Sequence, residues 1–171
     1  RSRDPKTILL EAEQLLKDGF KEVTLLGQNV NSYCWEENGE TMTFAKLMAK
    51  VAQLSPDFRV RYATSHPKDI SDELIETMAQ YENICKYIHL PVQSGSNPML
   101  KRMNRVYTRE YYLERIHKIR EVMPDCAIST DVIAGFCGET EEDHQATMSL
   151  MEEVGYDYAN MFKYSVREGT M

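Results

Sequence analysis

Close cysteine pairs are absent from this sequence. The four cysteines, Cys34, Cys85, Cys126 and Cys137, are widely spaced along 171 residues. A zinc site, a redox dithiol or a local iron–sulfur motif needs cysteines within a few positions of each other. We therefore interpret these four as buried or incidental free thiols, and we expect no metal site in the sequence.

Long apolar runs and an excess of positive charge are also missing. No hydrophobic stretch reaches the length of a membrane-spanning helix, and the first residues are charged rather than signal-like. We therefore expect a cytoplasmic protein with no membrane partner. Lys and Arg number 20 against 27 Asp and Glu, which gives a net charge of −7 at pH 7. Because contacts with RNA phosphates need a basic protein surface, we do not expect this chain alone to bind RNA tightly.

The sequence does have the composition of a globular domain. Hydrophobic residues make up 42% of the chain and charged residues 27%, which suits one buried core. The chain begins at Arg1 and ends at Met171 within a strand-to-loop pattern. We therefore expect residues 1–171 to be a single domain cut from a larger protein.

Helical and strand-like segments alternate along the whole chain. Apolar residues at helical spacing, with capping residues at Asp4, Ser71, Thr108 and Thr140, predict helices over 5–18, 44–51, 72–78, 109–123 and 140–154. Short apolar runs predict strands over 22–27, 59–65, 85–91, 127–134 and 158–164. Such alternation indicates an α/β protein with parallel strands and right-handed crossovers. An open doubly wound sheet and part of a β/α barrel both fit this pattern.

The carboxyl ends of the predicted strands are unusually polar. In either architecture, functional groups gather at these ends. The segments are 27–29, 65–69, 91–95, 135–139 and 164–168. Amides, hydroxyls and charges of both signs around one rim suit a zwitterionic or nucleoside-like ligand. The same residues also make ordinary turns, so a rim without a ligand stays open as an alternative.

Three side chains near this rim have a functional and a structural interpretation. His66 and His89 are either acid–base groups or hydrogen-bonded structural histidines. Asp131 lies inside an apolar strand, where an unpaired carboxylate is costly. That position favours a ligand or a cationic partner for Asp131.

Two loops also have both a functional and a structural interpretation. Gly135 and Gly138 precede a helix, but the phosphate-loop lysine and the dinucleotide spacing are missing, so their phosphate-binding signal is weak. Segment 28–41 is long and holds the only tryptophan, Trp35. It is either a substrate loop or an insertion.

Several of these segments match one known family. They include His-Pro-Lys-Asp at 66–69, His-Leu-Pro-Val-Gln-Ser-Gly-Ser at 89–96 and Asp-Val-Ile-Ala-Gly-Phe at 131–136. Further matches lie at 1–3, 26–31, 103–108, 138–140 and 164–170, in order from the first residue to the last. In these stretches the chain resembles the radical S-adenosylmethionine methylthiotransferases, specifically the branch acting on tRNA (the MiaB-like proteins). Cys137, Val166 and Glu168 depart from it, each standing where proline is common.

The resemblance implies a fold and a set of missing parts. The fold is a TIM-like barrel of six β/α units with outer helices, of which this chain would hold units two to six. The first strand and its C-x-x-x-C-x-x-C loop, which carries one 4Fe-4S cluster, would lie outside the sequence. So would an N-terminal methylthiotransferase domain with a second cluster and a C-terminal RNA-binding TRAM domain. None of the four cysteines here replaces the missing ligands, so an inactive fragment is expected.

The resemblance also implies a function. S-adenosylmethionine would be cleaved reductively, and a methylthio group would be added to C2 of N6-isopentenyladenosine beside the anticodon of tRNA. The partners would be the tRNA anticodon loop and an electron donor such as flavodoxin or ferredoxin. Alternatives are a related enzyme acting on threonylcarbamoyl-adenosine in tRNA or on an aspartate of a ribosomal protein. A binding module with a barrel-like fold but no catalysis is a third possibility.

Specific residues are assigned by their place in the matched segments. Gln28 and Asn29 would meet the methionine end of S-adenosylmethionine, with Ser65 and His66 beside them. Its ribose would contact Gln93, Ser94 and Asp131. Its adenine would contact Ile133, Gly135 and Phe136. Arg167 would pair with a carboxylate or an RNA phosphate, and no residue of the sequence is assigned a catalytic role.

Overall fold

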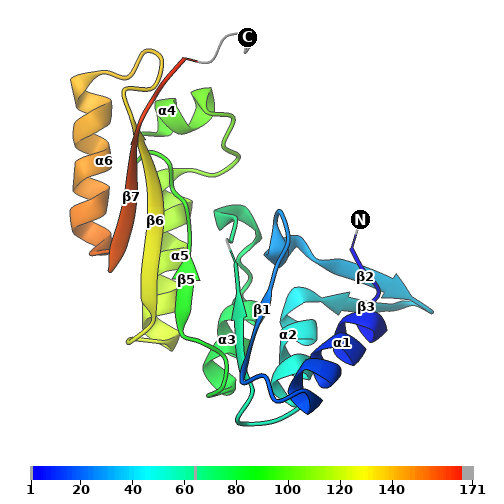
Figure 1. Cartoon of the computed structure of the whole chain (residues 1–171). Coiled ribbons are helices and arrows are strands. Elements are labelled where there is room, and N and C mark those ends of the chain that lie inside the picture. The colour runs from blue at the N-terminus through cyan, green and yellow to red at the C-terminus, as the bar shows by residue number, and fades with distance from the viewer. Residues whose placement is uncertain (1, 64, 167–171) are drawn as a thin grey trace.

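A computed structural model describes residues 2–63 and 65–166 of the chain (Figure 1). Its α-helices are α1 (Pro5–Lys17), α2 (Phe44–Ala52), α3 (Asp72–Gln80), α4 (Asn97–Arg102), α5 (Arg109–Val122) and α6 (Glu141–Val154). Its 3₁₀ helices are η1 (Val30–Ser32) and η2 (Pro67–Asp69). Its strands are β1 (Glu22–Leu25), β2 (Cys34–Glu37), β3 (Glu40–Thr43), β4 (Arg59–Tyr62), β5 (Tyr87–His89), β6 (Ala127–Ala134) and β7 (Tyr158–Lys163).

The helices begin where the sequence predicts because capping side chains satisfy free backbone N–H groups. The predicted caps that accept such a bond are Asp4, Ser71, Thr108 and Thr140. At α6 the bonding is reciprocal, since the side chain of Asp143 also accepts from the backbone of Thr140. Gly155, in the left-handed conformation with φ 59°, ends this helix. The predicted helices are therefore confirmed, with only small shifts at their ends.

Parallel strands follow one another in space in the order in which they occur in the sequence. β1 pairs with β4, and β5, β6 and β7 form a second parallel set in that order. A bridge between Val60 and Ile84 joins the two sets, and the N–H of Cys85 donates to the carbonyl of Val60 at 3.0 Å. A doubly wound sheet reverses its strand order at a switch point, whereas a barrel does not. The order β1, β4, β5, β6, β7 is therefore that of a partial barrel, which confirms the predicted fold class.

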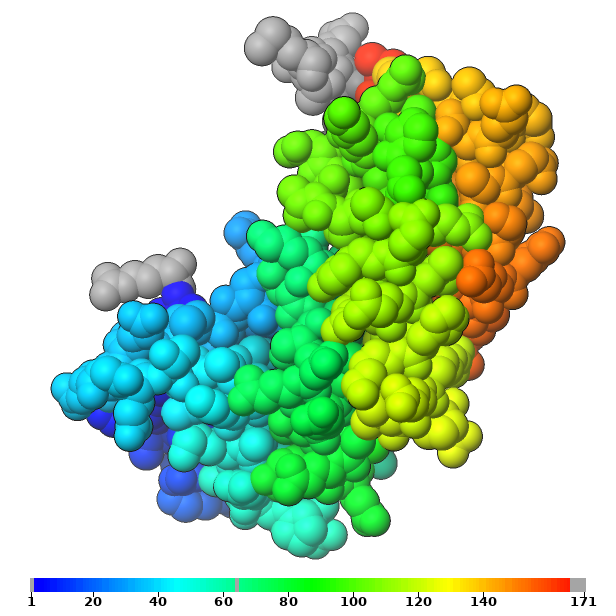
Figure 2. Space-filling view, turned by 180° about the vertical axis from the view of Figure 1, so that it is seen from behind, coloured from blue at the N-terminus to red at the C-terminus, as the bar shows by residue number. Residues whose placement is uncertain are grey.

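One continuous core lies between these strands and the helices. Its fully buried members include Met48, Phe58, Ile75, Met78, Ile88, Ile116, Ile119, Ile128 and Leu150. Figure 2, seen from behind, shows the helical side of the molecule, with α2 in cyan, α5 in yellow-green and α6 in orange. In Figure 1, β5 and β6 lie in front of α5. The opposite face of the sheet is thus turned away from these helices.

Segment 28–41 contains a hairpin that we did not predict. β2 and β3 pair antiparallel, with Glu37 opposite Glu40. The two residues between them, Asn38 and Gly39, both have positive φ, 53° and 81°. Asn-Gly with positive φ at both positions is the signature of a type I′ hairpin turn. The sequence therefore held this signal, and the segment contains an ordered hairpin, while its role as a substrate loop or an insertion stays a prediction.

Helix α4 is the other unpredicted element. It is short, and the side chain of Ser96 accepts a hydrogen bond from the N–H of Met99 at its start. Pro98 stands in the first turn, where its missing N–H costs nothing. The helix follows the loop after β5 and lies near the carboxyl ends of the strands (Figure 1).

Candidate functional site

The carboxyl ends of β1, β4, β5, β6 and β7 all lie on the upper side of the molecule in Figure 1. The loops that carry the predicted site residues therefore share one rim. The described residues of this rim fall into two groups. One is centred on the loops after β1 and β4, and the other spans β5 and β6.

Asn29 anchors the first group to the loop after β4. Its Nδ2 donates to Oδ2 of Asp69 at 2.7 Å, and the hydroxyl of Ser32 donates to the same oxygen at 2.5 Å. Burial alone would raise the pKa of Asp69, but these two bonds and the nearby Lys68 lower it below its usual range. The Oδ1 atom of Asn29 is buried and has no partner among the residues that the structure describes, so an acceptor is left over at this position.

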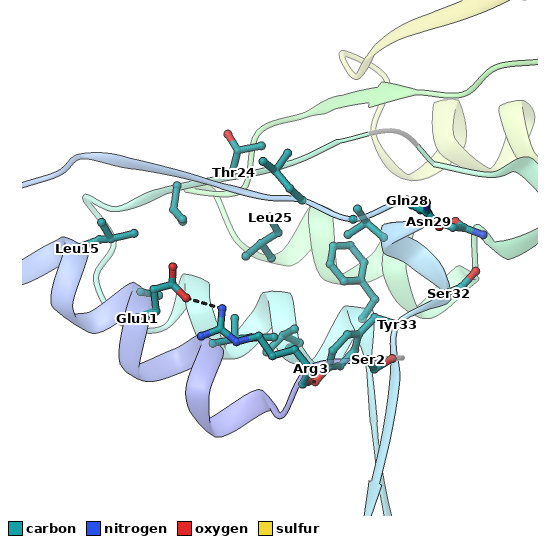
Figure 3. Close-up of a pocket in the computed structure, with 18 residues that line it drawn as sticks. Ser2, Arg3, Glu11, Leu15, Thr24, Leu25, Gln28, Asn29, Ser32 and Tyr33 are labelled. Atoms are coloured by element: carbon teal, nitrogen blue, oxygen red, sulfur yellow. Dashed lines mark hydrogen bonds and ion pairs between the residues drawn. The ribbon is translucent and has the colours of Figure 1, made fainter.

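Gln28 and Asn29 also line a hollow beside β1 (Figure 3). Its volume is about 730 Å³, and much of its wall is apolar. Leu25 points toward α1 across this space, whereas Thr24 points to the other side of β1. An ion pair between Arg3 and Glu11, at 2.6 Å, lies along α1. The hollow is large enough for a small ligand, but Gln93 and Asp131 are not among its lining residues.

His66 is held as a structural group at the end of β4. Asn31 donates from Nδ2 to the carbonyl of His66 at 3.3 Å and accepts from its N–H at 3.1 Å. Nδ1 of His66 accepts from the N–H of Lys68 at 3.2 Å, and its ring packs edge-on against Tyr107. Burial, with the nearby cations Arg105 and Lys68, lowers the pKa of His66 despite Asp69. The contacts suit the structural interpretation, and the acid–base interpretation stays a prediction.

Ser65 connects the first group to the second. Its N–H donates to the carbonyl of His89 at 3.0 Å, and its buried hydroxyl donates to the Tyr62 hydroxyl at 3.3 Å. The end of β4 is thereby fixed against β5. Whether Ser65 or His66 contacts a ligand stays a prediction.

Gln93 and Asp131 lie on neighbouring chain segments, as predicted. The N–H of Gln93 donates to the carbonyl of Asp131 at 2.8 Å, and the N–H of Ile133 donates to the carbonyl of Gln93 at 2.9 Å. Gln93 has φ 70°, an unusual conformation for a residue with a side chain. Such strain is frequent at functional positions. These bonds bring three of the predicted residues together.

Ser94 is fully buried beside them. Its hydroxyl lies 3.2 Å from the hydroxyl of Thr147 in α6, and it accepts from the N–H of Ser96 at 3.2 Å. The side chain thus fastens the loop after β5 to α6. A ligand contact by Ser94 stays a prediction, and its hydroxyl already has these partners.

Asp131 has polar partners within the fold, while the ligand or cationic partner that its place in an apolar strand favours stays a prediction. Nδ2 of Asn160, opposite it in β7, donates to Oδ1 at 2.9 Å. Nε2 of His89 lies 3.4 Å from Oδ2. Asp131 and His89 both keep some side-chain exposure, 24% and 19%. The carboxylate is therefore paired within the fold and still reachable.

The loop after β6 ends the second group. Gly135, with φ 75°, donates its N–H to the carboxylate of Glu139. Phe136 packs edge-on against Tyr164, with ring centroids 5.0 Å apart. Arg102 donates to the carbonyls of Cys137 and Gly138 at 3.2 and 3.0 Å. These contacts give the loop a fixed shape, and the predicted adenine contacts of Ile133, Gly135 and Phe136 stay predictions. Arg167 lies outside the described residues.

Sequence reasoning missed three members of the second group. These are Tyr87, Ser129 and Asn160, which lie on the same face of β5, β6 and β7. Ser129 forms hydrogen bonds with Tyr87 and His89, and Asn160 donates one to Asp131. The polar residues at alternate positions of β6, Ser129 and Asp131, carried a signal for this face. Which residues of β5 and β7 meet them depends on strand register.

The cysteines and the helices bear on two further expectations. In the parts of the chain that the structure describes, no group of three His, Cys, Asp or Glu side chains is placed to hold a metal ion. Cys34 and Cys137 are exposed, and burial raises the pKa of Cys126 to about 11, which disfavours its thiolate. The residues present do not fit an iron–sulfur cluster. Over the same described ranges, no helix is long and apolar enough to cross a membrane.

Curated relatives match almost the whole of this chain at high identity. A tRNA-2-methylthio-N(6)-dimethylallyladenosine synthase from Parabacteroides distasonis is 61% identical over 170 residues, which is 99% of this chain and 37% of the relative. An enzyme of the same name from Bacteroides thetaiotaomicron is 59% identical over 171 residues, 99% of this chain and 38% of the relative. The chain thus spans less than two fifths of the length of the curated relatives it matches.

Solved structures share the fold at much lower identity. A radical S-adenosylmethionine methyltransferase, TsrM from Kitasatospora setae, matches 94% of this chain and 31% of its own, with a TM-score of 0.70 at 14% identity. Coproporphyrinogen III oxidase (HemN) from Escherichia coli matches 94% of this chain and 37% of its own, with a TM-score of 0.66 at 15% identity. The family model described as the Radical SAM superfamily matches residues 1–151. With this match over most of its length and strands in barrel order, the chain belongs to the radical SAM superfamily.

Proposed function

We propose that this chain is the S-adenosylmethionine-binding part of a tRNA methylthiotransferase. The modified position would be C2 of N6-isopentenyladenosine next to the anticodon. The observation that carries the proposal is the 61% identity over 170 residues to an enzyme named for that product. The match covers 99% of the chain, so it spans the strand-end loops as well as the core, and it is these loops that differ among enzymes of one fold.

Different rim residues would contact different portions of S-adenosylmethionine. Gln28 and Asn29 present amides for the methionine end, and the unpaired Oδ1 of Asn29 is an acceptor for its ammonium group. Asp131, with Gln93 bonded beside it, presents a carboxylate for ribose hydroxyls. Ile133 and Phe136 offer apolar surface for adenine, as the half-buried Phe136 packs on Tyr164. Ser65, His66 and Ser94 brace the loops that carry these groups.

When bound, S-adenosylmethionine supplies radical chemistry that the side chains themselves cannot perform. The role of this chain would be to orient S-adenosylmethionine and to keep water away from it. The iron–sulfur clusters of such an enzyme would be held by residues outside this sequence, since the cysteines here do not fit one. We therefore expect no cleavage of S-adenosylmethionine by this chain alone. Liquid chromatography for 5′-deoxyadenosine after iron–sulfur reconstitution tests this, and product above the level without protein would contradict it.

The partners follow from the proposed activity. The anticodon loop of tRNA is the substrate, and with a net charge of −7 the chain would leave most phosphate contacts to basic surface elsewhere. Arg167 is one candidate contact within the sequence. A small electron donor such as flavodoxin or ferredoxin would serve the clusters. The site of action would be the cytoplasm, where tRNA is.

Mass spectrometry tests the proposed substrate. The gene that encodes this chain is deleted, and nucleosides from total tRNA are compared with those of the parent strain. We expect the 2-methylthio form of N6-isopentenyladenosine to disappear and N6-isopentenyladenosine to accumulate. Loss of the methylthio group from threonylcarbamoyl-adenosine, or from a ribosomal-protein aspartate, would replace this function with one of the two related activities. An unchanged pattern in all three would reject methylthiotransfer.

A further inference from the structure

A row of polar side chains crosses the inner face of the second sheet, the face turned away from the outer helices. We name this row the floor network: Tyr87 and His89 of β5, Ser129 and Asp131 of β6, and Asn160 of β7. Its place follows from strand geometry, because alternate residues of a strand share a face. Ile88, between Tyr87 and His89, and Ile128 and Val132, on either side of Ser129 and Asp131, are buried in the core on the opposite face. The register brings His89 opposite Ser129 and Asp131 opposite Asn160.

The network is continuous. The Tyr87 hydroxyl lies 2.7 Å from Oγ of Ser129, and Oγ of Ser129 lies 2.8 Å from Nδ1 of His89. Nε2 of His89 lies 3.4 Å from Oδ2 of Asp131. Asn160 donates from Nδ2 to Oδ1 of Asp131 at 2.9 Å. Each oxygen of the carboxylate therefore faces a different polar side chain.

The chemistry at Asp131 favours one tautomer of His89. A carboxylate accepts hydrogen bonds and donates none, so the 3.4 Å approach of Nε2 to Oδ2 favours a proton on Nε2. In that tautomer Nδ1 is an acceptor, so Ser129 would donate to it and accept from the Tyr87 hydroxyl. Donors would then run from Tyr87 toward Asp131 on one side of the carboxylate, while Asn160 donates to it from the other.

We infer that His89 is a positioning residue that holds the Asp131 carboxylate in place for ribose hydroxyls of S-adenosylmethionine. This inference rests on the proposed function. The carboxylate sits below the rim, beside Gln93, and its remaining lone pairs are free to accept from a ligand. His89 and Asn160 fix the two oxygens, so the carboxylate does not rotate when a ligand approaches. A preorganised acceptor binds more tightly than one that must be ordered first.

The tautomer of His89 is the first test, and it needs no ligand. Long-range ¹H–¹⁵N spectra of the chain labelled with [¹⁵N]histidine distinguish a proton on Nε2 from one on Nδ1. We expect the Nε2–H form of His89 in the unaltered chain and a loss of this preference in Ser129→Ala. An Nδ1–H form in the unaltered chain would place a lone pair against Asp131 and would overturn the inference.

Binding is the second test, by equilibrium dialysis of the chain with radiolabelled S-adenosylmethionine. We expect His89→Ala to bind about tenfold more weakly, and His89→Gln, whose amide places an N–H near the Nε2 position, to recover most of that loss. His117→Gln, on the exposed side of α5, is the matched control and should bind like the unaltered chain. Thermal unfolding of each variant separates lost binding from lost folding.

Each outcome of the binding test decides something different. Unchanged binding in a folded His89→Ala chain would overturn the positioning role while leaving the proposed function intact. Equal weakening in folded His89→Ala and His89→Gln would also overturn it, because the N–H would then not matter. No binding by the unaltered chain would overturn the proposed role in binding S-adenosylmethionine, and the positioning role with it.

Discussion

Gly95 lies where the loop after β5 passes closest to α6. Its N–H donates to the hydroxyl of Thr147 at 2.9 Å. A Cβ atom at Gly95 would lie 2.4 Å from the carbonyl oxygen of Ala146 and 2.6 Å from Cα of Thr147. Both are backbone atoms, so neither can turn away. The sequence shows a glycine here, but only the contact with a helix some fifty residues later explains why no side chain fits.

We therefore expect Gly95→Ala to destabilise the chain by about 3 kcal/mol, because the loop and α6 must separate. Urea unfolding followed by circular dichroism measures the change. Gly27→Ala is the control, since its nearest side-chain contact would be 3.5 Å from Val30, an ordinary distance. A Gly95→Ala chain as stable as the Gly27→Ala chain would show that the loop does not pack as described.

Asp69 should make the free energy of unfolding depend on pH in the acid range. Its hydrogen bonds from Ser32 and Asn29 and the nearby Lys68 lower its pKa from 3.8, against the effect of burial. A lowered folded-state pKa stabilises the fold above the unfolded value, and this stabilisation is lost as the pH falls through the folded value. We expect the free energy of unfolding to fall more steeply below about pH 4 in the unaltered chain than in Asp69→Asn.

Urea midpoints measured at steps between about pH 6 and about pH 2.5 test this difference. Asp125→Asn, at an exposed position, is the control and should follow the unaltered chain. Identical acid profiles for the unaltered chain and Asp69→Asn would mean that the bonds around Asp69 do not persist in solution.

Asp131 marks the limit of residue-level prediction. Its apolar surroundings in the sequence indicate that it needs a partner, and the structure supplies His89 and Asn160. The identity of these two partners was not predictable from the sequence. His89 and Ser129, which bond to each other in the floor network, are 40 residues apart in the sequence, and pairing one strand a single residue out of register would turn their side chains to opposite faces.

Elements are where the sequence was most informative, since local signals suffice for them. Helix caps, helical spacing and glycine stops predicted the long helices because each of these acts within a few residues. The β2–β3 hairpin also had a local signal, Asn38-Gly39, which we overlooked inside a polar loop. Four of the five predicted strands stop short of their predicted carboxyl ends, whereas β6 has the predicted bounds.

The capping box of α6 gives a prediction at this scale. Thr140→Ala removes the acceptor for the N–H of Asp143 and should lower the free energy of unfolding by about 1 kcal/mol. Thr140→Ser keeps the hydroxyl and should stay close to the unaltered chain. Urea unfolding measures both, and hydrogen exchange should rise first in the initial turn of α6. Equal stability of the two variants would mean that the cap contributes nothing.

At the scale of the whole molecule, β1 is the exposed end of the parallel series. Among the described residues it pairs with β4 alone, and Val23, Thr24 and Leu25 of this strand line the hollow near α1 (Figure 3). An unpaired strand edge is a template for another strand. We therefore expect self-association of the chain through this edge.

We expect the mass of the chain in solution to rise with concentration, and Thr24→Lys to weaken the association about tenfold, because a charge on an edge strand opposes pairing. Sedimentation equilibrium measures the constants. Gln80→Lys, on the exposed surface of α3, adds the same charge away from the edge and is the control. A monomer at every concentration would contradict the prediction.

The sequence by itself determined the order of helices and strands, the polar character of the strand ends and the family, because these depend on neighbouring residues and on motifs. The alternation of helices and strands left an open sheet and a barrel equally possible, whereas the family resemblance implied a barrel. Only the tertiary structure decided between them, since strand order depends on hydrogen bonds between segments far apart in the chain. The same long-range pairing placed Gln93 beside Asp131, set His89 against that carboxylate, and buried the hydroxyl of Ser94 against α6.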